Sequence, residues 1–393
     1  MKIWKYKRLS ECSNFVSERT SNIAIDNYIS TENMIENRGG VKEAAALPDV
    51  KSTSAYRPND ILLSNIRPYF CKIWFADKNG SCSNDVLVVR AKKEIDAKFL
   101  YYVLSDQNFF NWDSMTSKGT KMPRGTPNAI MKYSVPDISL PTQQKIASIL
   151  SAYDNLIQNY KKQIEALQTA ASELYKEWFV RFRFPGYQTA RFENGIPEGW
   201  KVERIGNVGE VIGGGTPSTE NEEYWDGDIP WLSPVDLSDN TNVYVSRGGK
   251  NITKLGLQKS SAKMMPKNTV LLSSRAPVGY VALAKNPICT NQGFKSVVCN
   301  TSVIQPIYLY FYFRMNKNYL QSIASGATFP ELSGSMMKKL KVLLPTIVIQ
   351  QAFSKRANIF IAKAELLSEQ ITNLTQQRDL LLPRLMSGKI EVN

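Results

Sequence analysis

The sequence predicts an α+β protein built from two copies of one unit, each an α+β domain followed by a long helix. Three observations support this class. The chain has 393 residues, which exceeds the usual size of a single hydrophobic core. Short motifs recur in order at a nearly constant offset, and two stretches share one heptad pattern of apolar residues. We expect the two helices to separate the domains and to pair with each other as an intramolecular antiparallel coiled coil.

The two copies show in motifs that recur about half a chain apart. ILLS at 61–64 and VLLS at 270–273 differ by 209 residues, and Trp4 and Trp200 differ by 196. Loop insertions between fixed elements explain the changing offset. Three further motifs share an offset of 207 residues: 82–84 (CSN) with 289–291 (CTN), 119–123 (GTKMP) with 326–330 (GATFP), and 143–144 (QQ) with 350–351 (QQ). An ordered series of this kind indicates internal duplication.

Each copy ends in an unbroken heptad seam, which predicts a coiled-coil helix. The second seam lies 207 residues after the first and is apolar except at Arg378. Helices of about 40 residues would be about 60 Å long, more than one such domain needs for its own core. The alternative to pairing within the chain is a homodimer. The seam positions are Ile146, Leu150, Tyr153, Ile157, Tyr160, Ile164, Leu167, Ala171, Leu174 and Trp178, then Phe353, Ala357, Phe360, Ala364, Leu367, Ile371, Leu374, Arg378, Leu381 and Leu385.

Proline and glycine mark the expected boundaries. Pro141 and Pro345 precede the helical patterns, Thr142 and Thr346 can cap them, and Pro383 should kink or end the second helix. The Gly- and Pro-rich segment between the copies is expected to be a linker. The expected order is a domain at 1–140, a helix at 141–184, a linker at 185–199, a domain at 200–345 and a helix at 346–393.

Within the domains the pattern favours short strands and a few helices. Each domain is expected to be α+β with a small sheet, for which a barrel is one alternative. The expected strands lie within 61–68, 72–76, 85–91, 269–275, 279–284 and 294–300, and the expected helices at 97–112 and 307–324.

Composition narrows the classes of function. The net charge of +14 favours a polyanionic partner such as nucleic acid, although basic solvated surfaces are also common. The five cysteines form no C-x-x-C pair, and the absence of histidine excludes His-dependent nucleophiles and His-ligated metals. No apolar run is long enough to span a bilayer, and no secretory h-region is visible, so a cytoplasmic protein is expected.

Three phrases resemble one protein family. They are SLPTQQKIASILSAYDNLIQNYKKQIEALQTAASELYKEWFVRF at 139–182, FENGIPEGWKVERIGNVGEVIGGGTPST at 192–219 and LLPRLMSGKI at 381–390. They are similar to the DNA-specificity (S) subunits of type I restriction-modification enzymes, and the resemblance covers essentially the whole chain. It implies that each domain is a target recognition domain reading one half of a split, asymmetric site in double-stranded DNA. It also implies that the helices set the unread spacer and dock two modification (methyltransferase) subunits, with restriction subunits as further partners.

The same resemblance implies a non-catalytic chain without a cofactor, whose partner subunits use S-adenosylmethionine, and ATP with Mg²⁺ for restriction. The sequence agrees, because it contains no methyltransferase, Walker or cofactor-binding motif. Its nearest nuclease-like fragment, Asp85 with Asp96-Ala97-Lys98, has a spacing that often arises by chance. The alternative is a repressor or scaffold that binds DNA alone, which would not co-purify with a modification subunit.

The DNA-binding candidates of the first domain lie on a basic segment and at two repeated motifs. Lys118, Lys121 and Arg124 occupy the Gly- and Pro-containing segment 116–132, which suits phosphate contact and, through an arginine fork, guanine. A solvated loop is the alternative. Arg67 follows the repeated strand end, where an ion pair is equally plausible, and Asn84 could contact a base or cap a turn.

The second domain contains a glycine run, IGGGTPST at 212–219, which resembles the family's loop after the first strand of a recognition domain. Its glycines, Gly214 among them, would let the backbone approach another group closely, while Thr216 and Ser218 could donate to phosphate. It is not a nucleotide-binding P-loop, because no Gly-Lys-Ser/Thr follows. The other candidates in this domain are Arg275, Asn291, Gln292 and Lys338.

Overall fold

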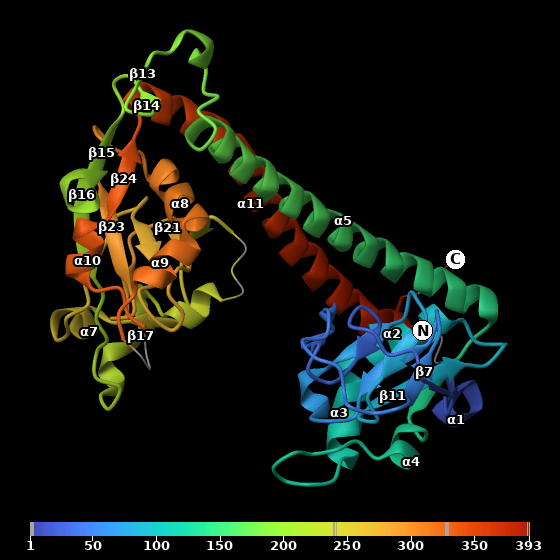
Figure 1. The fold of residues 1–393 in the computed structure, drawn as a ribbon. Coiled ribbons are helices and arrows are strands. Elements are labelled where there is room, and N and C mark those ends of the chain that lie inside the picture. Colours follow the sequence, from blue (N-terminus) through green and yellow to red (C-terminus); the bar gives the residue numbers. More distant parts are fainter. Residues whose placement is uncertain (1–3, 239, 241, 327–329, 391, 393) are drawn as a thin grey trace. The chain divides into compact units, whose positions relative to one another are not determined.

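The structure, a computed structural model, describes residues 4–238, 240, 242–326, 330–390 and 392 (Figure 1). The chain divides into two compact units, the first made of Met1–Asn159 with Thr372–Asn393 and the second of Tyr160–Ile371. Each unit holds one β-rich domain together with part of the long helices α5 (Leu140–Phe179) and α11 (Ile347–Met386). The predicted α+β class with a duplicated unit is confirmed.

The first domain contains two four-stranded sheets. One has the antiparallel order β2, β11, β8, β9, and the other the order β3, β7, β10, β4, with β10 parallel to β4. Strands β1 and β12 pair and join the two ends of the domain, and β5 pairs with β6. The strands are β1 (Lys5–Arg8), β2 (Ser13–Phe15), β3 (Arg19–Thr20), β4 (Tyr28–Ile29), β5 (Met34–Ile35), β6 (Gly40–Val41), β7 (Thr53–Tyr56), β8 (Ile61–Ser64), β9 (Ile73–Phe75), β10 (Gly80–Cys82), β11 (Val86–Ala91) and β12 (Ser134–Asp137).

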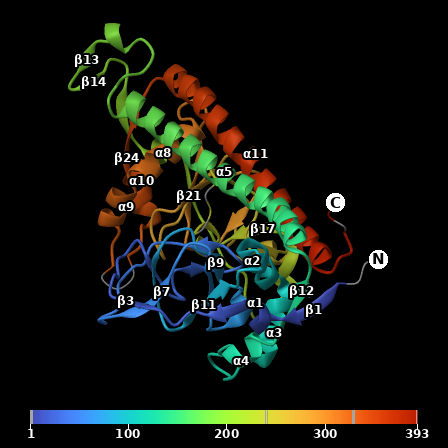
Figure 2. The ribbon, with the colours of Figure 1, turned by 90° about the vertical axis from the view of Figure 1, so that its right-hand side faces the viewer.

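Four short helices and one 3₁₀ turn complete the first domain, and α2 lies beside β9 and β11 (Figure 2). Its core joins Leu9, Phe99 and Phe109 to the start of α5 and the end of α11. The elements are α1 (Leu9–Cys12), α2 (Ala97–Ser105), α3 (Gln107–Thr116), α4 (Pro127–Ile130) and η1 (Pro68–Phe70).

The second domain contains a five-stranded sheet in the order β16, β23, β20, β21, β18 and a three-stranded sheet in the order β19, β17, β22. Strands β15 and β24 pair at the two ends of the domain, as β1 and β12 do in the first. The strands are β13 (Phe192–Glu193), β14 (Ile196–Pro197), β15 (Lys201–Arg204), β16 (Gly209–Gly213), β17 (Trp225–Leu232), β18 (Tyr244–Val245), β19 (Lys250–Ile252), β20 (Val270–Leu272), β21 (Val281–Ala284), β22 (Cys289–Thr290), β23 (Lys295–Cys299) and β24 (Lys341–Leu344).

Helix α8 packs on β20 and β21 of the larger sheet, α6 and α10 contact its edge strand β16, and α7 contacts β17 and β19 of the smaller sheet. The expected linker region holds a short hairpin, β13 with β14. The elements are α6 (Ile205–Val208), α7 (Lys254–Gln258), α8 (Pro306–Met315), α9 (Lys317–Ile323), α10 (Gly334–Lys339), η2 (Tyr187–Thr189), η3 (Glu222–Tyr224) and η4 (Pro234–Leu237).

The six predicted strands are present as β8, β9, β11, β20, β21 and β23. The helical segments predicted at 97–112 and 307–324 are present, each divided into two shorter helices, α2 with α3 and α8 with α9. In the first domain the break falls at Asp106, whose backbone is extended and whose carboxylate accepts the N–H of Asn108 at 2.8 Å. This is the geometry of an N-cap, which starts a new helix. In the second domain the break falls at Asn316.

The long helices pair in both units through the predicted seam. In the first unit Ile146 and Leu150 of α5 share a core with Leu382 and Leu385 of α11. In the second unit the other end of α5 packs on the start of α11, so that Trp178 and Phe353 lie with ring centroids 6.0 Å apart. All twenty seam positions are buried or half-buried. The pairing is therefore antiparallel in each unit.

One seam position, Arg378, is polar, and it has a partner. Its guanidinium lies 2.7 Å from the Asp154 carboxylate of α5, which also accepts the Tyr102 hydroxyl at 2.6 Å. Both charged side chains are mostly buried, at 17% and 23% exposure. Because a buried charge without a partner is costly, the pair explains how an arginine fits in an apolar seam.

The repeated Gln-Gln motif begins each long helix, and its two glutamines have different roles. The first glutamine is buried in both copies and the second is exposed. Gln143 accepts the N–H of Asp96 at 2.9 Å and donates to Ile138 O at 2.9 Å. Asp96 is the N-cap of α2, so the glutamine links the long helix to the start of a domain helix.

Gln350 makes the equivalent connection in the second unit. It accepts the N–H of Gln305, the N-cap of α8, at 2.9 Å, and donates to Val303 O and Pro345 O at 3.1 and 2.8 Å. The feature that both copies share is thus a buried glutamine side chain, which hydrogen-bonds the backbone before its own long helix and the backbone at the start of a domain helix.

The helix ends correct one expectation. Helix α5 begins at Leu140, and Ser139 rather than Thr142 stands before it, with Ser139 O accepting the N–H of Gln143. Thr346 immediately precedes α11, where a cap was expected. Pro383 lies inside α11, which ends shortly after it at Met386.

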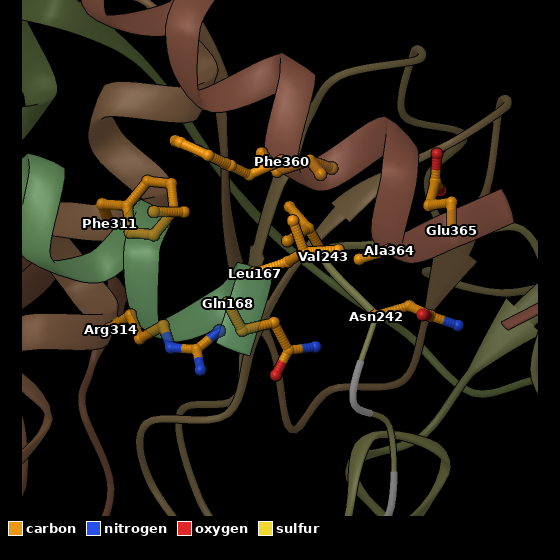
Figure 3. A pocket seen from close by; sticks show the side chains of 11 residues that line it. Leu167, Gln168, Asn242, Val243, Phe311, Arg314, Phe360, Ala364 and Glu365 are labelled. Atoms are coloured by element: carbon orange, nitrogen blue, oxygen red, sulfur yellow. The ribbon is translucent and has the colours of Figure 1, made fainter. Parts of the chain in front are cut away.

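A small pocket of about 10 Å³ lies in the second unit between the domain and the helix pair (Figure 3). Leu167, Phe311 and Phe360 form apolar walls, and Asn242 and Arg314 add polar groups. A volume of this size corresponds to about one water molecule. It is too small for a cofactor or substrate.

Candidate nucleic-acid interface

The basic segment of the first domain is a loop closed by its own backbone. Lys118 and Arg124 exchange two N–H to O hydrogen bonds of 2.9 Å each. The loop is fixed to the segment after β8, since Arg67 N–H donates to Pro123 O at 2.8 Å and Gly125 N–H donates to Asn65 O at 3.0 Å. Residues 118–125 together with 65–67 are named the first junction.

The first junction gathers most of the predicted residues of its domain. Lys118, Lys121 and Arg124 are exposed, and the Arg124 guanidinium lies 3.1 Å from the Asp85 carboxylate. Asp85 O accepts the N–H of Asn65, so the turn that carries exposed Asn84 borders the junction. The cations thus lie on one loop beside one turn, and the Asp85 carboxylate of that turn faces Arg124.

Arg67 adopts a left-handed backbone conformation within this junction. Its φ of 51° lies in the left-handed region, and its guanidinium carbon lies 5.9 Å from the centroid of the Phe70 ring. The side chain is half-buried, and its Nε is buried and has no hydrogen-bond partner in the part of the chain that the structure describes. Its role is therefore partly to shape the turn before Pro68.

The second domain repeats the junction with different side chains. Ser325 and Glu331 exchange backbone hydrogen bonds of 3.1 and 2.8 Å, and Leu332 N–H donates to Ser274 O at 2.9 Å. These positions follow those of the first domain at the 207- and 209-residue offsets. Residues 325–326 and 330–332 together with 274–276 are named the second junction; the repeated residues 327–329 lie outside the described chain.

In the second junction the loop carries a carboxylate in place of the arginine that the first loop carries. The loop here supplies a carboxylate, Glu331, which lies 3.8 Å from the Arg275 guanidinium and 3.3 Å from Lys295 Nζ. Arg275 comes from the segment after β20, at the strand end where the sequence placed it.

The glycine run packs against its own domain. A Cβ on Gly214 would collide with the carbonyl oxygens of Thr290 and Asn291, and Gly215 N–H donates to Thr290 O at 2.9 Å. The Thr216 hydroxyl donates to the Gln292 side chain, and Trp225 Nε1 donates to Ser218 O at 3.0 Å. The structure therefore brings this loop beside Asn291 and Gln292, and the close approach that the glycines permit is to the chain itself.

Lys338 lies elsewhere in the same domain. It is exposed on α10 and lines a surface hollow with Asn207 and Glu210, neither of which belongs to the second junction.

A buried carboxyl, which is not among the residues predicted from the sequence, lies beneath the first junction. Asp113 of α3 is 0% exposed, both of its oxygens lack a hydrogen-bond partner among the described residues, and burial raises the pKa of its carboxyl to about 7. A Cβ on Gly125 would lie 2.5 Å from Asp113 Oδ1 and 2.8 Å from Asn65 Oδ1, so only glycine fits here. The repeat contained a signal, because the residue 207 positions later is the buried Leu320.

The nuclease-like fragment has structural partners. Asp96 caps α2 by accepting the N–H of Phe99 at 2.7 Å, and Asp85 pairs with Arg124. Among the described residues there is no group of three or more Cys, Asp or Glu placed to hold a metal ion. None of the described helices is long and apolar enough to cross a membrane.

Comparison with known proteins gives a consistent result. The family model "Type I restriction modification DNA specificity domain" matches residues 1–169 and 197–376. The type I restriction enzyme HindI specificity subunit of Haemophilus influenzae is 25% identical and is matched over 99% of this chain and 100% of its own length. The MjaIX specificity subunit of Methanocaldococcus jannaschii is 43% identical over 188 residues, which is 47% of this chain and 42% of that relative.

The fold also has a solved counterpart. The crystal structure of the type I restriction-modification S subunit from M. genitalium covers 100% of this chain and 98% of its own, with a TM-score of 0.60 and 17% identity. The solved chain shares the fold described above, in which duplicated β-rich domains are combined with paired long helices. The chain belongs to the family of type I restriction-modification DNA-specificity subunits. In such a complex this subunit is non-catalytic.

Proposed function

We propose that each domain of this chain reads one half of a bipartite, asymmetric site in double-stranded DNA. The observation that carries the proposal is the repeated junction, which in both domains holds an exposed arginine beside a carboxylate, on the loop in the first domain and on the strand-end segment in the second. Cations fixed in this way suit phosphate contact and guanine readout, which need donors at defined positions. The two recognition domains that we propose span residues 1–140 and 200–345.

The candidate contacts follow from these positions. In the first domain they are Arg67, Asn84, Lys118, Lys121 and Arg124. In the second they are Gly214, Thr216, Ser218, Arg275, Asn291, Gln292 and Lys338. We assign Gly214 an indirect role, since its backbone supports the Thr216 and Gln292 pair.

The paired helices α5 and α11 would set the unread spacer and dock two modification subunits. Each helix has 40 residues and contributes to both units, which suits a spacing element. The modification subunits would bind S-adenosylmethionine, and the restriction subunits would use ATP with Mg²⁺. The assembly would act in the cytoplasm.

Co-expression with the modification subunit of the same system tests the proposal. We expect a stable complex whose host DNA carries methylated adenines in two short half-sites separated by a fixed number of unread base pairs. Single-molecule sequencing of that DNA gives both half-sites at once. A chain that binds one contiguous sequence alone and does not co-purify with the modification subunit would instead be a repressor or scaffold.

Lengthening both helices by three heptads should lengthen the spacer by about nine base pairs. The insertion, after Ala166 in α5 and after Glu365 in α11, adds 21 residues to each helix, or about 31 Å. Heptad steps preserve the seam, and about 31 Å is close to one turn of DNA, so both domains keep the same face of the duplex. Methylome sequencing measures the spacer.

A control insertion of the same length belongs in the turn between β13 and β14, at 194–195, outside the helices. It should leave the spacer unchanged. An unchanged spacer in the active helix variant would refute the spacing role.

A further inference from the structure

The two junctions share one backbone arrangement but exchange the positions of their charges. In the first domain the loop carries the arginine, Arg124, and a turn outside the loop carries the carboxylate, Asp85. In the second domain the loop carries the carboxylate, Glu331, and the strand-end segment carries the arginine, Arg275. What persists between the copies is a guanidinium held by a carboxylate at an exposed junction.

In the first junction the held guanidinium remains available to a ligand. The Arg124 side chain is 55% exposed and the Asp85 side chain 34%, and their closest contact involves Nη1 alone. A guanidinium has five N–H donors in a planar fork, so one carboxylate leaves donors free. The Arg124 backbone is fixed by its two bonds to Lys118, and Asp85 limits the directions in which the side chain points.

The second junction also holds an exposed arginine beside a carboxylate, but here the arginine lies on the strand-end segment and the carboxylate on the loop. The Arg275 and Glu331 side chains are each 39% exposed, with Nη1 of the arginine 3.8 Å from the carboxylate. Glu331 is held in turn by Lys295, whose side chain is only 17% exposed and which also donates to Gln292 O at 3.4 Å. The carboxylate is thus anchored to the turn that carries the candidate residues Asn291 and Gln292.

We propose that Asp85 and Glu331 are positioning residues that orient Arg124 and Arg275, respectively, toward the guanine of a G·C pair, one in each half-site. The inference rests on the proposed function, which it makes specific. Exposed ion pairs of this kind contribute at most about 1 kcal/mol to stability, so their main effect here is on direction. An arginine released from its carboxylate would reach phosphates as well as bases and would lose selectivity, because phosphate contacts carry no sequence information.

The test measures base preference separately in each half-site. The chain, in complex with its modification subunits, methylates a DNA library in which every position of both half-sites is randomised in turn. Arg124→Ala should lower the preference for one G·C pair in one half-site by about tenfold or more, the usual range for a bidentate contact. Asp85→Asn should lower the same preference several-fold while raising affinity for non-specific DNA, and Asp85→Glu should keep most of it.

The corresponding variants of the second domain should affect the other half-site. Arg275→Ala and Glu331→Gln should change one G·C preference in the other half-site only. Matched controls are Arg57→Ala, which breaks the exposed 2.8 Å pair with Glu18, and Lys201→Ala, which breaks the pair with Glu203. Both controls should leave all base preferences unchanged.

The outcomes separate the two proposals. If the unmodified complex methylates no bipartite motif, the proposed function and this inference both fail. If it does, but the Asp85 and Glu331 variants alter only the overall rate with every base preference unchanged, the positioning role is refuted and the proposed function stands. Thermal unfolding of each variant confirms that a change in preference occurs in a folded protein.

Discussion

Gln350→Ala should destabilise the second unit by about 2–4 kcal/mol, although glutamine is usually a surface residue. The side chain is 0% exposed and bonds three backbone groups, on Gln305, Val303 and Pro345. Alanine would leave these groups without their partner at the start of both α8 and α11. Hydrogen exchange measured on peptides from α8 and the start of α11, as a function of urea, gives the change in unfolding free energy of this unit.

The neighbouring residue provides the control. Gln351 is exposed, and Gln351→Ala should change stability by less than about 0.5 kcal/mol. The pair Gln143→Ala and Gln144→Ala repeats the comparison in the first unit, with a smaller loss expected because Gln143 makes two such bonds. Equal effects of the two substitutions within either pair would contradict the structural role of the buried glutamine.

The second large effect is a dependence of first-domain stability on pH, caused by Asp113. Burial raises the pKa of its carboxyl from 3.8 to about 7. Between these values the folded state binds a proton that the unfolded state has released, so stability falls as pH rises from about 4 to 7 and then levels. At about 1.4 kcal/mol per pH unit, the loss from pH 5 to pH 8 approaches 3 kcal/mol.

Asp113→Asn removes the titrating group with little change in shape. Relative to this variant, the unmodified chain should become less stable by about 3 kcal/mol between pH 5 and pH 8. Urea-dependent hydrogen exchange of α3 and β8 peptides at the two pH values measures the difference. Asp77→Asn, at an exposed position of the same domain, is the control and should show no such difference. A pH-independent difference between the unmodified chain and Asp113→Asn would contradict the assignment.

The parts of the fold that could be predicted are those that a periodic or repeated pattern of apolar residues marks in the sequence. The spacing of apolar residues was enough to predict the heptad seams, and all twenty seam positions are buried or half-buried in the structure. The strands β8 and β20 were visible because the same apolar run occurs twice. The breaks at Asp106 and Asn316 were not visible, because the apolar pattern continues through them and the break depends on a local cap.

The site was less predictable, because its chemistry depends on pairs of residues distant in sequence. Arg67 and Arg275 were placed at a repeated strand end, but only three-dimensional contacts show that Arg124 is the first-domain counterpart of Arg275. The sequence marks Asp85 only as part of a weak nuclease-like fragment and gives no signal for Glu331, because the role of a carboxylate depends on the cation that it faces. The glycine run did predict that its backbone approaches another group closely. That group is the backbone of residues 290–291, which lie far along the chain.

The ion pair between Arg378 and Asp154 has a consequence for how this chain changes over generations. A slip of α11 by one heptad would set Asp154 opposite an apolar residue such as Leu385 and strand both charges in the seam. Matched seven-residue steps, made in both helices, change the helix length while keeping both this pair and the heptad seam. Descendants of this chain should accordingly sample a ladder of discrete spacer lengths rather than a continuous range.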